Sequence, residues 1–568
     1  MHVGFCYKKI YVSVMKLKNN LFLGSILSLF TVFGVQGKVV LPSILSDNMV
    51  LQQQSEVKLW GTAAAGSTVT VTLGWGGSYT AKAGEGGEWE VKLPTPKAGG
   101  PYSIEFSDGE TTTLNNVLIG EVWLCSGQSN MVMTLSGFTN PVQPVNKAEE
   151  ILQSATSATP IRVFTLRNQK SKTEMNDCTG SWGEHTDRTL RKTSAVAYFF
   201  AKDLYERLGI PVGIIVSAWG ATPIEAWISP KTLSDFKEID LSHLTNDKNI
   251  NAQRACVLYN GMIAPLRKLC IKGAIWYQGE NNRFNPSLYE RLMPALVKDW
   301  RNVWQQGEFP FYYVQIAPYD YEPDKQQDRS GAALREAQLH SVSKIPNSGM
   351  VVTLDIGEKN CIHPAEKEKV GQRLAAWALS KTYAIEGIAY GGPVYRDFEV
   401  SNGKIILHFD TETPLRIDNM ESGIFEISGE DKIFYPAQAE ISSDGKSVIV
   451  SSSEVSQPVA ARYGYRNYVK GCLYDRDGLP SSSFRTDDWE SEDVTYSSLS
   501  ISKNDKDDIN IYASKGNLHI DGMKKSEMVY IFNPLGEVVR SVRLSPGNNV
   551  IEGLDKGVYI VNACRILL

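Results

Sequence analysis

A serine lies at the point where an apolar run of the chain stops abruptly in small and polar residues. Residues 117–124 are mostly apolar and are followed by Cys125, Ser126, Gly127, Gln128, Ser129 and Asn130. A buried parallel strand ends in this way at the rim of an α/β sheet, where Gly127 permits a sharp turn and Ser129 is presented as a candidate nucleophile. The same composition is also typical of an ordinary turn. The interpretation therefore depends on the side chains that other strands deliver to this rim.

Four further strands are expected beside this one. Apolar runs at residues 212–217, 272–277, 311–316 and 350–355 alternate with helical patterns at residues 194–209, 261–269, 288–300, 332–343 and from Pro364 onward. This alternation predicts a five-stranded, mostly parallel sheet in a three-layer α/β domain. Polar segments follow three of these strands, at residues 217–227, 278–282 and 362–364. Because the carboxyl ends of parallel strands share one edge, these segments are expected to converge on Ser129.

The converging segments supply the groups that ester hydrolysis needs. A serine hydroxyl is a weak nucleophile until a base removes its proton, and His363 is the expected base because it lies on this edge beside the rigid Pro364. Four other histidines have no comparable setting: His185, His243, His340 and His408. The developing oxyanion needs preorganised donors. The candidates are the N–H groups of Ser129 and Gly220 and a side-chain amide from Gln278 or Asn282.

The length and net charge of the chain limit the classes of protein to which it can belong. The chain has 568 residues and a net charge of −5, without a basic stripe. That balance argues against a nucleic-acid partner. The length exceeds a single core and predicts three or four domains.

The N-terminus has the pattern of a signal peptide. Lys16 and Lys18 precede an apolar run at residues 21–35, and a cleavage site is predicted after Gly37. The run is short for a membrane span, so we expect an exported protein that is periplasmic, on the cell surface or secreted. The seven cysteines that follow form no C-x-x-C pair and indicate neither a disulfide scaffold nor a zinc site. Their pairing is left open, and no metal is predicted.

The hydrophobic pattern divides the chain. We expect upstream residues and a signal peptide at 1–37, a β-sandwich at 38–116, the α/β domain at 117–383 and a second β domain at 384–489. An acidic, serine-rich linker at 490–508 leads to a small β domain at 509–568. Within it, residues 531–539 and 557–561 resemble the C-terminal β tails of some exported Gram-negative proteins, although an ordinary β cap fits equally well.

Five ordered motifs resemble those of the sialate O-acetylesterase family, which belongs to the SGNH hydrolases. They lie at residues 127–131, 217–227, 259–265, 276–281 and 362–364. The resemblance spans about residues 39–489 and implies a flavodoxin-like fold and an esterase that removes acetyl groups from sugar hydroxyls without a metal or cofactor. It implies Ser129 as the nucleophile, His363 as the base, and oxyanion donors at Ser129, Gly220 and Gln278. Substrate contacts are expected from Gln128, Asn130, Glu225, Trp227 and Asn281, although Trp227 fits the core equally well.

One position departs from the pattern of the superfamily. Many SGNH enzymes carry an aspartate three residues before the histidine, where this chain has Asn360. An amide does not stabilise an imidazolium as a carboxylate does. Asp355, at the predicted strand end, is the first candidate for the acid that orients His363, and Glu280 is the second. A Ser–His dyad supported by a backbone carbonyl is the third alternative.

Two functions from different classes fit these observations. The first is an exported serine esterase that deacetylates O-acetylated sugars, with sialic acid as the expected substrate and acetylated xylan or pectin as the alternative. The second is a non-catalytic carbohydrate-binding surface protein built around an inactive α/β core. The intact Ser129 and His363 pair favours the esterase. A phospholipase or protease is disfavoured because the chain shows no lipid-facing helix and no groove signature for a substrate strand. The oligomeric state is left open.

Overall fold

The computed structural model describes residues 38–246, 249–321, 328–490 and 494–496, and the backbone of residues 510–514, 517–523, 526–532, 538–552, 554, 558–561 and 564–567. The predicted signal peptide at 1–37 and most of the predicted linker lie outside the described residues. None of the helices in the described ranges is long and apolar enough to cross a membrane.

The middle of the chain forms a mostly parallel sheet, which confirms the predicted α/β class. Its strands follow the order β11-β10-β12-β7-β13-β14-β15. Their bounds are Trp182–Gly183, Ile161–Thr165, Val212–Ala218, Thr111–Gly127, Gly273–Tyr277, Phe311–Val314 and Ser348–Val351. All neighbours pair in parallel except β10 and β11. The five expected strands are present, and the short β10 and β11 extend the sheet beyond them.

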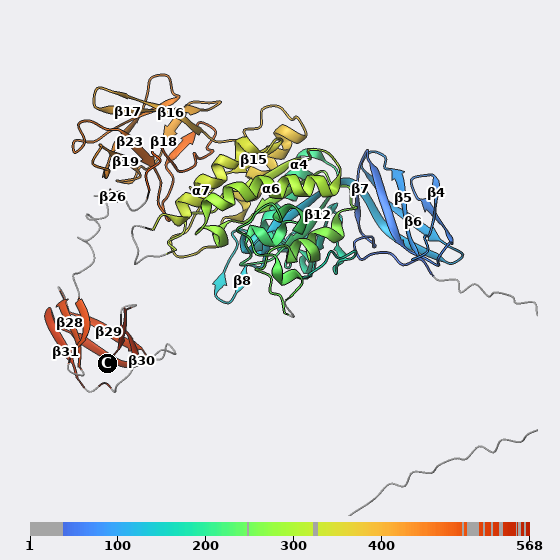
Figure 1. Cartoon of the computed structure of the whole chain (residues 1–568), viewed down its shortest axis with the longest axis horizontal. Coiled ribbons are helices and arrows are strands. Elements are labelled where there is room, and N and C mark those ends of the chain that lie inside the picture. The colour runs from blue at the N-terminus through green and yellow to red at the C-terminus, as the bar shows by residue number, and fades with distance from the viewer. Residues whose placement is uncertain are drawn as a thin grey trace, which may run out of the picture.

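Helices cover both faces of this sheet because its strands are apolar on both sides. On one face, α4 (Ala195–Leu208) and α8 (Lys367–Trp377) pack against Trp123, Ile275 and Tyr312. On the other, α6 (Pro286–Trp304) and α7 (Ser330–Ser341) pack against Leu124, Trp276 and Tyr313. Figure 1 shows α6 and α7 lying across the sheet in the centre of the molecule. The short helices are α1 (Ser129–Val132), α2 (Ala148–Gln153), α3 (Asp187–Leu190) and α5 (Pro230–Leu233).

Two predicted bounds at the loop that carries the histidine are wrong. β15 ends at Val351, so Asp355 lies in a turn beyond the strand. α8 begins at Lys367, with Glu366 as its N-cap, and not at Pro364. The chain between these elements is therefore a long loop, in which Glu358 and Cys361 form an isolated β-bridge. The predicted helix at 261–269 is a π-helical turn, Tyr259–Ile263, followed by a short 3₁₀ turn, Ala264–Leu266.

The N-terminal β layers are joined to the central sheet through one continuous strand. β7 pairs with β6 through its first half and with β12 and β13 through its second half. The predicted boundary at residues 116 and 117 thus falls inside this strand, which Figure 1 shows running from the blue layers into the green domain. The other strands here are β1 (Val50–Gln52), β2 (Glu56–Thr62), β3 (Thr68–Leu73), β4 (Ser78–Lys82), β5 (Glu88–Pro94) and β6 (Gly99–Ser107).

A second β-rich region follows the α/β domain and is tied to it by buried polar groups. Arg335 of α7 is fully buried and donates hydrogen bonds to the Ser483 hydroxyl at 3.1 Å and the Asn467 carbonyl at 3.3 Å. Its strands are β16 (Val394–Ser401), β17 (Lys404–Asp410), β18 (Leu415–Ile417), β19 (Phe425–Ser428), β20 (Ile433–Pro436), β21 (Gln438–Ile441), β22 (Ser447–Ser451), β23 (Ala460–Tyr463), β24 (Leu473–Asp475), β25 (Phe484–Arg485) and β26 (Thr495–Tyr496).

The last part of the chain is also built from strands and has its own small apolar cluster, which includes Leu518, Ile520, Val529 and Ile531. Its strands are β27 (Asn510–Ser514), β28 (Asn517–Met523), β29 (Glu527–Phe532), β30 (Val538–Leu544), β31 (Gly547–Ile551), β32 (Val558–Val561) and β33 (Cys564–Leu567). They form two separate sheets, β27-β28-β31 and β30-β29-β32-β33.

Candidate active site

Ser129 is presented by a tight turn at the carboxyl end of β7. Gly127 has a φ of +140°, and a Cβ at this position would lie 2.1 Å from the Tyr277 carbonyl oxygen of β13. Only glycine permits that approach. The next N–H, of Gln128, donates to the same carbonyl at 2.9 Å, and Ser129 then begins α1. The turn therefore places the serine directly above the middle of the parallel sheet.

His363 contacts Ser129 directly. Its Nε2 lies 2.8 Å from Ser129 Oγ, and it reaches this position from the loop between β15 and α8. Burial, and then the positive charge of Lys367, lowers the pKa of His363 to about 4. The imidazole is therefore neutral at neutral pH, which is the state that accepts a proton from a serine hydroxyl. The sequence predicted both residues, and the structure brings them together.

The other ring nitrogen of His363 contacts a residue that sequence reasoning missed. Nδ1 lies 2.7 Å from Gln143 Oε1. Gln143 ends a small hairpin, β8 (Phe138–Thr139) and β9 (Val142–Gln143), and Phe138 of the same hairpin packs edge-on against the imidazole at a centroid distance of 5.0 Å. Figure 1 shows this hairpin projecting from the α/β domain. A single glutamine 220 positions before the histidine carries no motif that predicts this contact.

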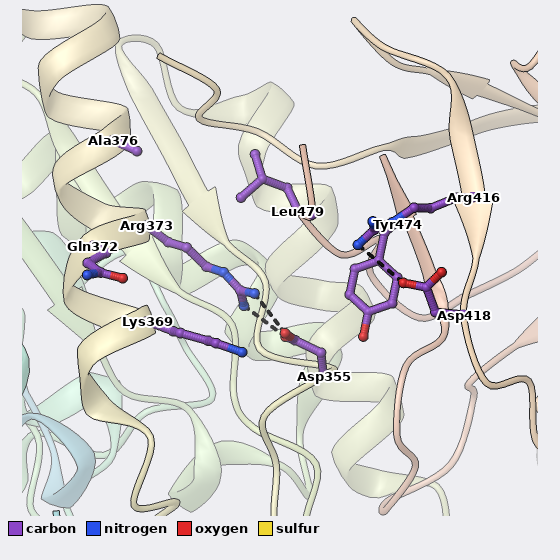
Figure 2. A pocket seen from close by; sticks show the side chains of 10 residues that line it. Asp355, Lys369, Gln372, Arg373, Ala376, Arg416, Asp418, Tyr474 and Leu479 are labelled. Carbon is purple, nitrogen blue, oxygen red and sulfur yellow. Dashed lines mark hydrogen bonds and ion pairs between the residues drawn. The ribbon is translucent and has the colours of Figure 1, made fainter. Parts of the chain in front are cut away.

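Asp355, the first candidate for the orienting acid, is not brought to His363. Its two carboxylate oxygens accept hydrogen bonds from the Arg373 guanidinium at 2.8 and 2.7 Å. Figure 2 shows this paired arrangement at the wall of a cavity of about 440 Å³ between α8 and the second β region. The prediction that Asp355 orients the histidine is therefore corrected, because the carboxylate is held by α8 and Gln143 occupies the Nδ1 position.

Glu280, the second candidate, is held by a different partner. Its Oε1 accepts a hydrogen bond from Asn130 Nδ2 at 2.6 Å, and the same amide nitrogen donates to the Ile362 carbonyl at 3.1 Å. Asn130 Oδ1 in turn accepts from the Lys367 ammonium. All three side chains are buried; burial raises the pKa of Glu280 and lowers that of Lys367 to about 7. Asn130 thus links the nucleophile turn and the histidine loop to two buried titratable side chains, Glu280 and Lys367.

The backbone N–H groups of Ser129 and Gly220 are the remaining candidates for oxyanion donors. A Cβ on Gly220 would lie 3.5 Å from Ser129 Cβ, so this glycine packs against the serine. Among the described residues, no partner accepts a hydrogen bond from the Ser129 or the Gly220 N–H. Backbone N–H groups without an acceptor in the protein are the usual donors to a tetrahedral oxyanion, so both stay candidates for that role.

Gln278 does not supply a third donor. Its Nε2 donates to the Thr222 carbonyl at 3.1 Å and to Asn282 Oδ1 at 2.7 Å, so both amide hydrogens are used. Asn282 also accepts from the Ile224 N–H at 3.0 Å. The prediction for Gln278 is therefore corrected: the two amides hold the loop that carries Gly220.

Of the five residues expected to contact substrate, three are buried and two reach the surface. Gln128, Asn130 and Trp227 are buried, which corrects the expectation for them. Gln128 Oε1 accepts from the Gly279 and Asn281 N–H groups, and Trp227 packs in the core against Trp276. Asn281 is exposed and Glu225 is half-buried, with Glu225 Oε2 accepting from Asn282 at 2.9 Å. Only these last two remain available at the rim.

Within the described ranges, no three His, Cys, Asp or Glu side chains cluster in a way that could hold a metal ion. The six cysteines described there are free thiols, namely Cys125, Cys178, Cys256, Cys270, Cys361 and Cys472.

The site therefore holds a serine paired with a neutral histidine at the carboxyl edge of a parallel sheet. Comparison with known proteins finds relatives that are carbohydrate esterases. Over 80% of its length the chain is similar to the whole crystal structure of a carbohydrate acetylesterase from Xanthomonas citri, with 34% identity and a TM-score of 0.72. The fold is thus that of an SGNH-type carbohydrate esterase, and the chain is a carboxylic ester hydrolase that removes acetyl groups from carbohydrates.

The family follows from two further comparisons. Residues 119–380 match the family described as carbohydrate esterase, sialic acid-specific acetylesterase. The sialate O-acetylesterases of Homo sapiens and Pongo abelii are each 30% identical over 425 residues, covering 68% of this chain and 79% of theirs. The chain belongs to the sialate O-acetylesterase family.

Proposed function

We propose that this protein is an exported serine esterase that hydrolyses O-acetyl groups of sialic acid through an acetyl-enzyme on Ser129. The hydrogen bond of 2.8 Å between Ser129 Oγ and His363 Nε2 carries the proposal. A carbohydrate-binding protein without activity has no physical need for a neutral histidine aligned on a serine hydroxyl beside unpartnered backbone N–H groups.

In the proposed acylation, Gln143 accepts the Nδ1 proton of His363, which leaves the lone pair of Nε2 facing Ser129. The Ser129 oxygen attacks the acetyl carbonyl carbon while its proton passes to Nε2. The carbonyl oxygen becomes an oxyanion beside the Ser129 and Gly220 N–H groups. The C–O bond to the sugar then breaks, and the imidazolium returns its proton to the sugar oxygen, which leaves as a hydroxyl.

In the proposed deacylation, water replaces the sugar. His363 Nε2 takes one proton from the water as its oxygen attacks the acetyl carbonyl, and the same two N–H groups receive the second oxyanion. Collapse breaks the bond to Ser129 Oγ, which recovers the proton from the imidazolium, and acetic acid leaves and ionises in solution to acetate. Gln143 supports the ring with a neutral amide oxygen in both steps, in the place where many serine hydrolases carry a carboxylate.

Buried side chains near Ser129 and His363 hold these two residues in place. Asn130 fixes the Ile362 carbonyl, and with it the histidine loop, to the turn that presents Ser129. Burial, and then the positive charge of Lys367, lowers the pKa of His363, so the base stays neutral at neutral pH. Gln278 and Asn282 hold the loop with Gly220 through Thr222 and Ile224. These four side chains, Asn130, Lys367, Gln278 and Asn282, are proposed as positioning residues.

The substrate is the part of the proposal that rests on relatives. The curated relatives are named sialate O-acetylesterase, which favours O-acetylated sialic acid. The structural neighbour from Xanthomonas citri is titled only as a carbohydrate acetylesterase, so acetylated xylan or pectin is the second candidate. Acetate release from O-acetylated sialic acid, acetylated xylan and acetylated pectin, at equal concentrations of acetyl groups, separates them. A sialate enzyme releases acetate fastest from the first; faster release from xylan or pectin contradicts the sialate assignment.

Two controls test the remaining parts. Ser129→Ala should abolish acetate release from every substrate, and equal rates for both proteins would contradict the esterase mechanism.

Export is proposed from residues 1–37. The N-terminal sequence of the protein recovered outside the cytoplasm should begin at Lys38, and recovery of the full chain only from the cytoplasm would contradict export.

A further inference from the structure

An exposed aromatic side chain lies beside the candidate active site. Phe284 is 71% exposed and is the one aromatic among the exposed large hydrophobic residues of the described chain. It follows Asn281 and Asn282 in the loop between β13 and α6. An isolated exposed aliphatic residue is ordinary on a protein surface, whereas an exposed aromatic ring offers a large, flat apolar face on which the C–H face of a sugar can pack.

The ring of Phe284 has one supported face and one open face. The Arg283 guanidinium carbon lies 3.9 Å from the Phe284 ring centroid and 4.5 Å from that of Tyr321. The guanidinium is therefore stacked on both rings and leaves the opposite face of Phe284 to solvent. Tyr321 in turn packs edge-on against Tyr319 at 4.9 Å. This stack holds the ring in place, so that a ligand that binds it pays little in lost side-chain freedom.

The backbone around Phe284 is fixed to the site on both sides. The Asn281 N–H donates to Gln128 Oε1 at 3.4 Å, and Gln128 immediately precedes Ser129. The Asn285 N–H donates to the Asn282 carbonyl at 2.9 Å, and the Asn285 side chain caps α6. Phe284 lies three positions after Asn281, and three residues of extended chain span at most about 11 Å. The aromatic face is thus within reach of a sugar joined to the one that is deacetylated.

We infer that Phe284, supported by Arg283, binds the pyranose ring next to the acetylated sugar, so that the enzyme acts on glycosidically linked sugars in preference to free monosaccharides. The apolar C–H face of the pyranose packs on the open face of the ring, and exposed Asn281 lies beside it to hydrogen-bond a hydroxyl. The inference rests on the proposed function and adds a second subsite to it.

The test uses matched pairs of free and linked substrates. The first pair is O-acetylated sialic acid and O-acetylated sialyllactose, and the second is acetylated xylose and acetylated xylotetraose. Wild type should show a higher kcat/KM on the linked member of the pair that it hydrolyses. Phe284→Ala should lower the ratio of linked to free kcat/KM by about 5- to 30-fold, mainly through KM. Phe284→Trp should keep the ratio. Val400→Ala, which removes a 51% exposed side chain from β16, is the control for loss of an exposed apolar group and should also keep it.

The possible outcomes distinguish failure of the proposed subsite from failure of the proposed esterase function. A Phe284→Ala variant that keeps the wild-type ratio, or a wild type that shows no preference for the linked substrate, overturns the subsite and leaves the proposed function standing. A wild type that releases acetate from neither pair refutes the proposed function and the subsite together.

Discussion

The contact between Gln143 and His363 predicts how the activity depends on pH. The structure places a neutral amide oxygen 2.7 Å from Nδ1 and gives His363 a pKa of about 4. Because the base works in its neutral form, kcat/KM should be constant through neutral pH and fall only below about pH 4. Replacing the amide by a carboxylate, in Gln143→Glu, adds a negative charge at hydrogen-bond distance from the ring.

The size of the change follows from the geometry. An opposite charge within about 4–6 Å shifts a pKa by about 1 to 3 in the direction that favours the charged form. The carboxylate favours imidazolium, so the pKa of His363 rises and the acid limb moves from about pH 4 to between about pH 5 and pH 7. That corresponds to about 1.4–4 kcal/mol of added stabilisation of the imidazolium.

The assay is the pH profile of kcat/KM for 4-nitrophenyl acetate, read at the isosbestic wavelength of 4-nitrophenol. Val142→Glu is the matched control, since it adds the same charge one residue earlier on the same strand, where the side chain is 80% exposed and points to the opposite face. Its acid limb should stay near that of wild type. An unchanged limb in Gln143→Glu, or equal shifts in both variants, would refute the placement of Gln143 against His363.

The remaining predictions concern the supporting residues. Lys367→Met removes a positive charge that lowers the pKa of His363, so the acid limb of the pH profile should move to higher pH. The measurement is the pH profile of kcat/KM, in which the control Lys367→Arg should stay closer to wild type. Asp355→Asn breaks a buried ion pair with Arg373, so chemical denaturation should show a loss of about 3 kcal/mol in unfolding free energy, while the turnover of the folded variant should match wild type; a turnover loss of orders of magnitude would restore Asp355 as the acid. Gly127→Ala forces a Cβ against the Tyr277 carbonyl, so thermal denaturation should show a destabilisation of about 1–3 kcal/mol or more, together with loss of esterase activity.

The residues at the strand ends could be predicted from the sequence because strand periodicity and sheet topology place them without side-chain detail. Ser129 follows an unmistakable apolar strand, and His363 follows the fifth strand, so their meeting at one edge required only that the sheet be parallel. The same reasoning placed Gly220 beside the serine. The class of fold followed for the same reason.

The partners of these residues could not be predicted in this way. The sequence pattern places Asp355 at a strand end, but β15 ends four residues earlier. Arg373 of α8 provides a bidentate partner for its carboxylate. Gln143 reaches the histidine from a hairpin whose position depends on tertiary packing alone. Trp227 lies in a motif with polar residues, yet it fills the core beside Trp276 because the loop turns its ring inward.

The central claim is that Ser129 carries the acetyl group during turnover. Rapid acid quenching of the enzyme with 4-nitrophenyl acetate, followed by peptide mass spectrometry, measures this directly. We expect one acetyl group on the peptide that contains Ser129 and none on that peptide from Ser129→Ala, a variant that should also be inactive on O-acetylated sugars. Acetylation of a different residue, or undiminished acetate release by Ser129→Ala, would contradict it.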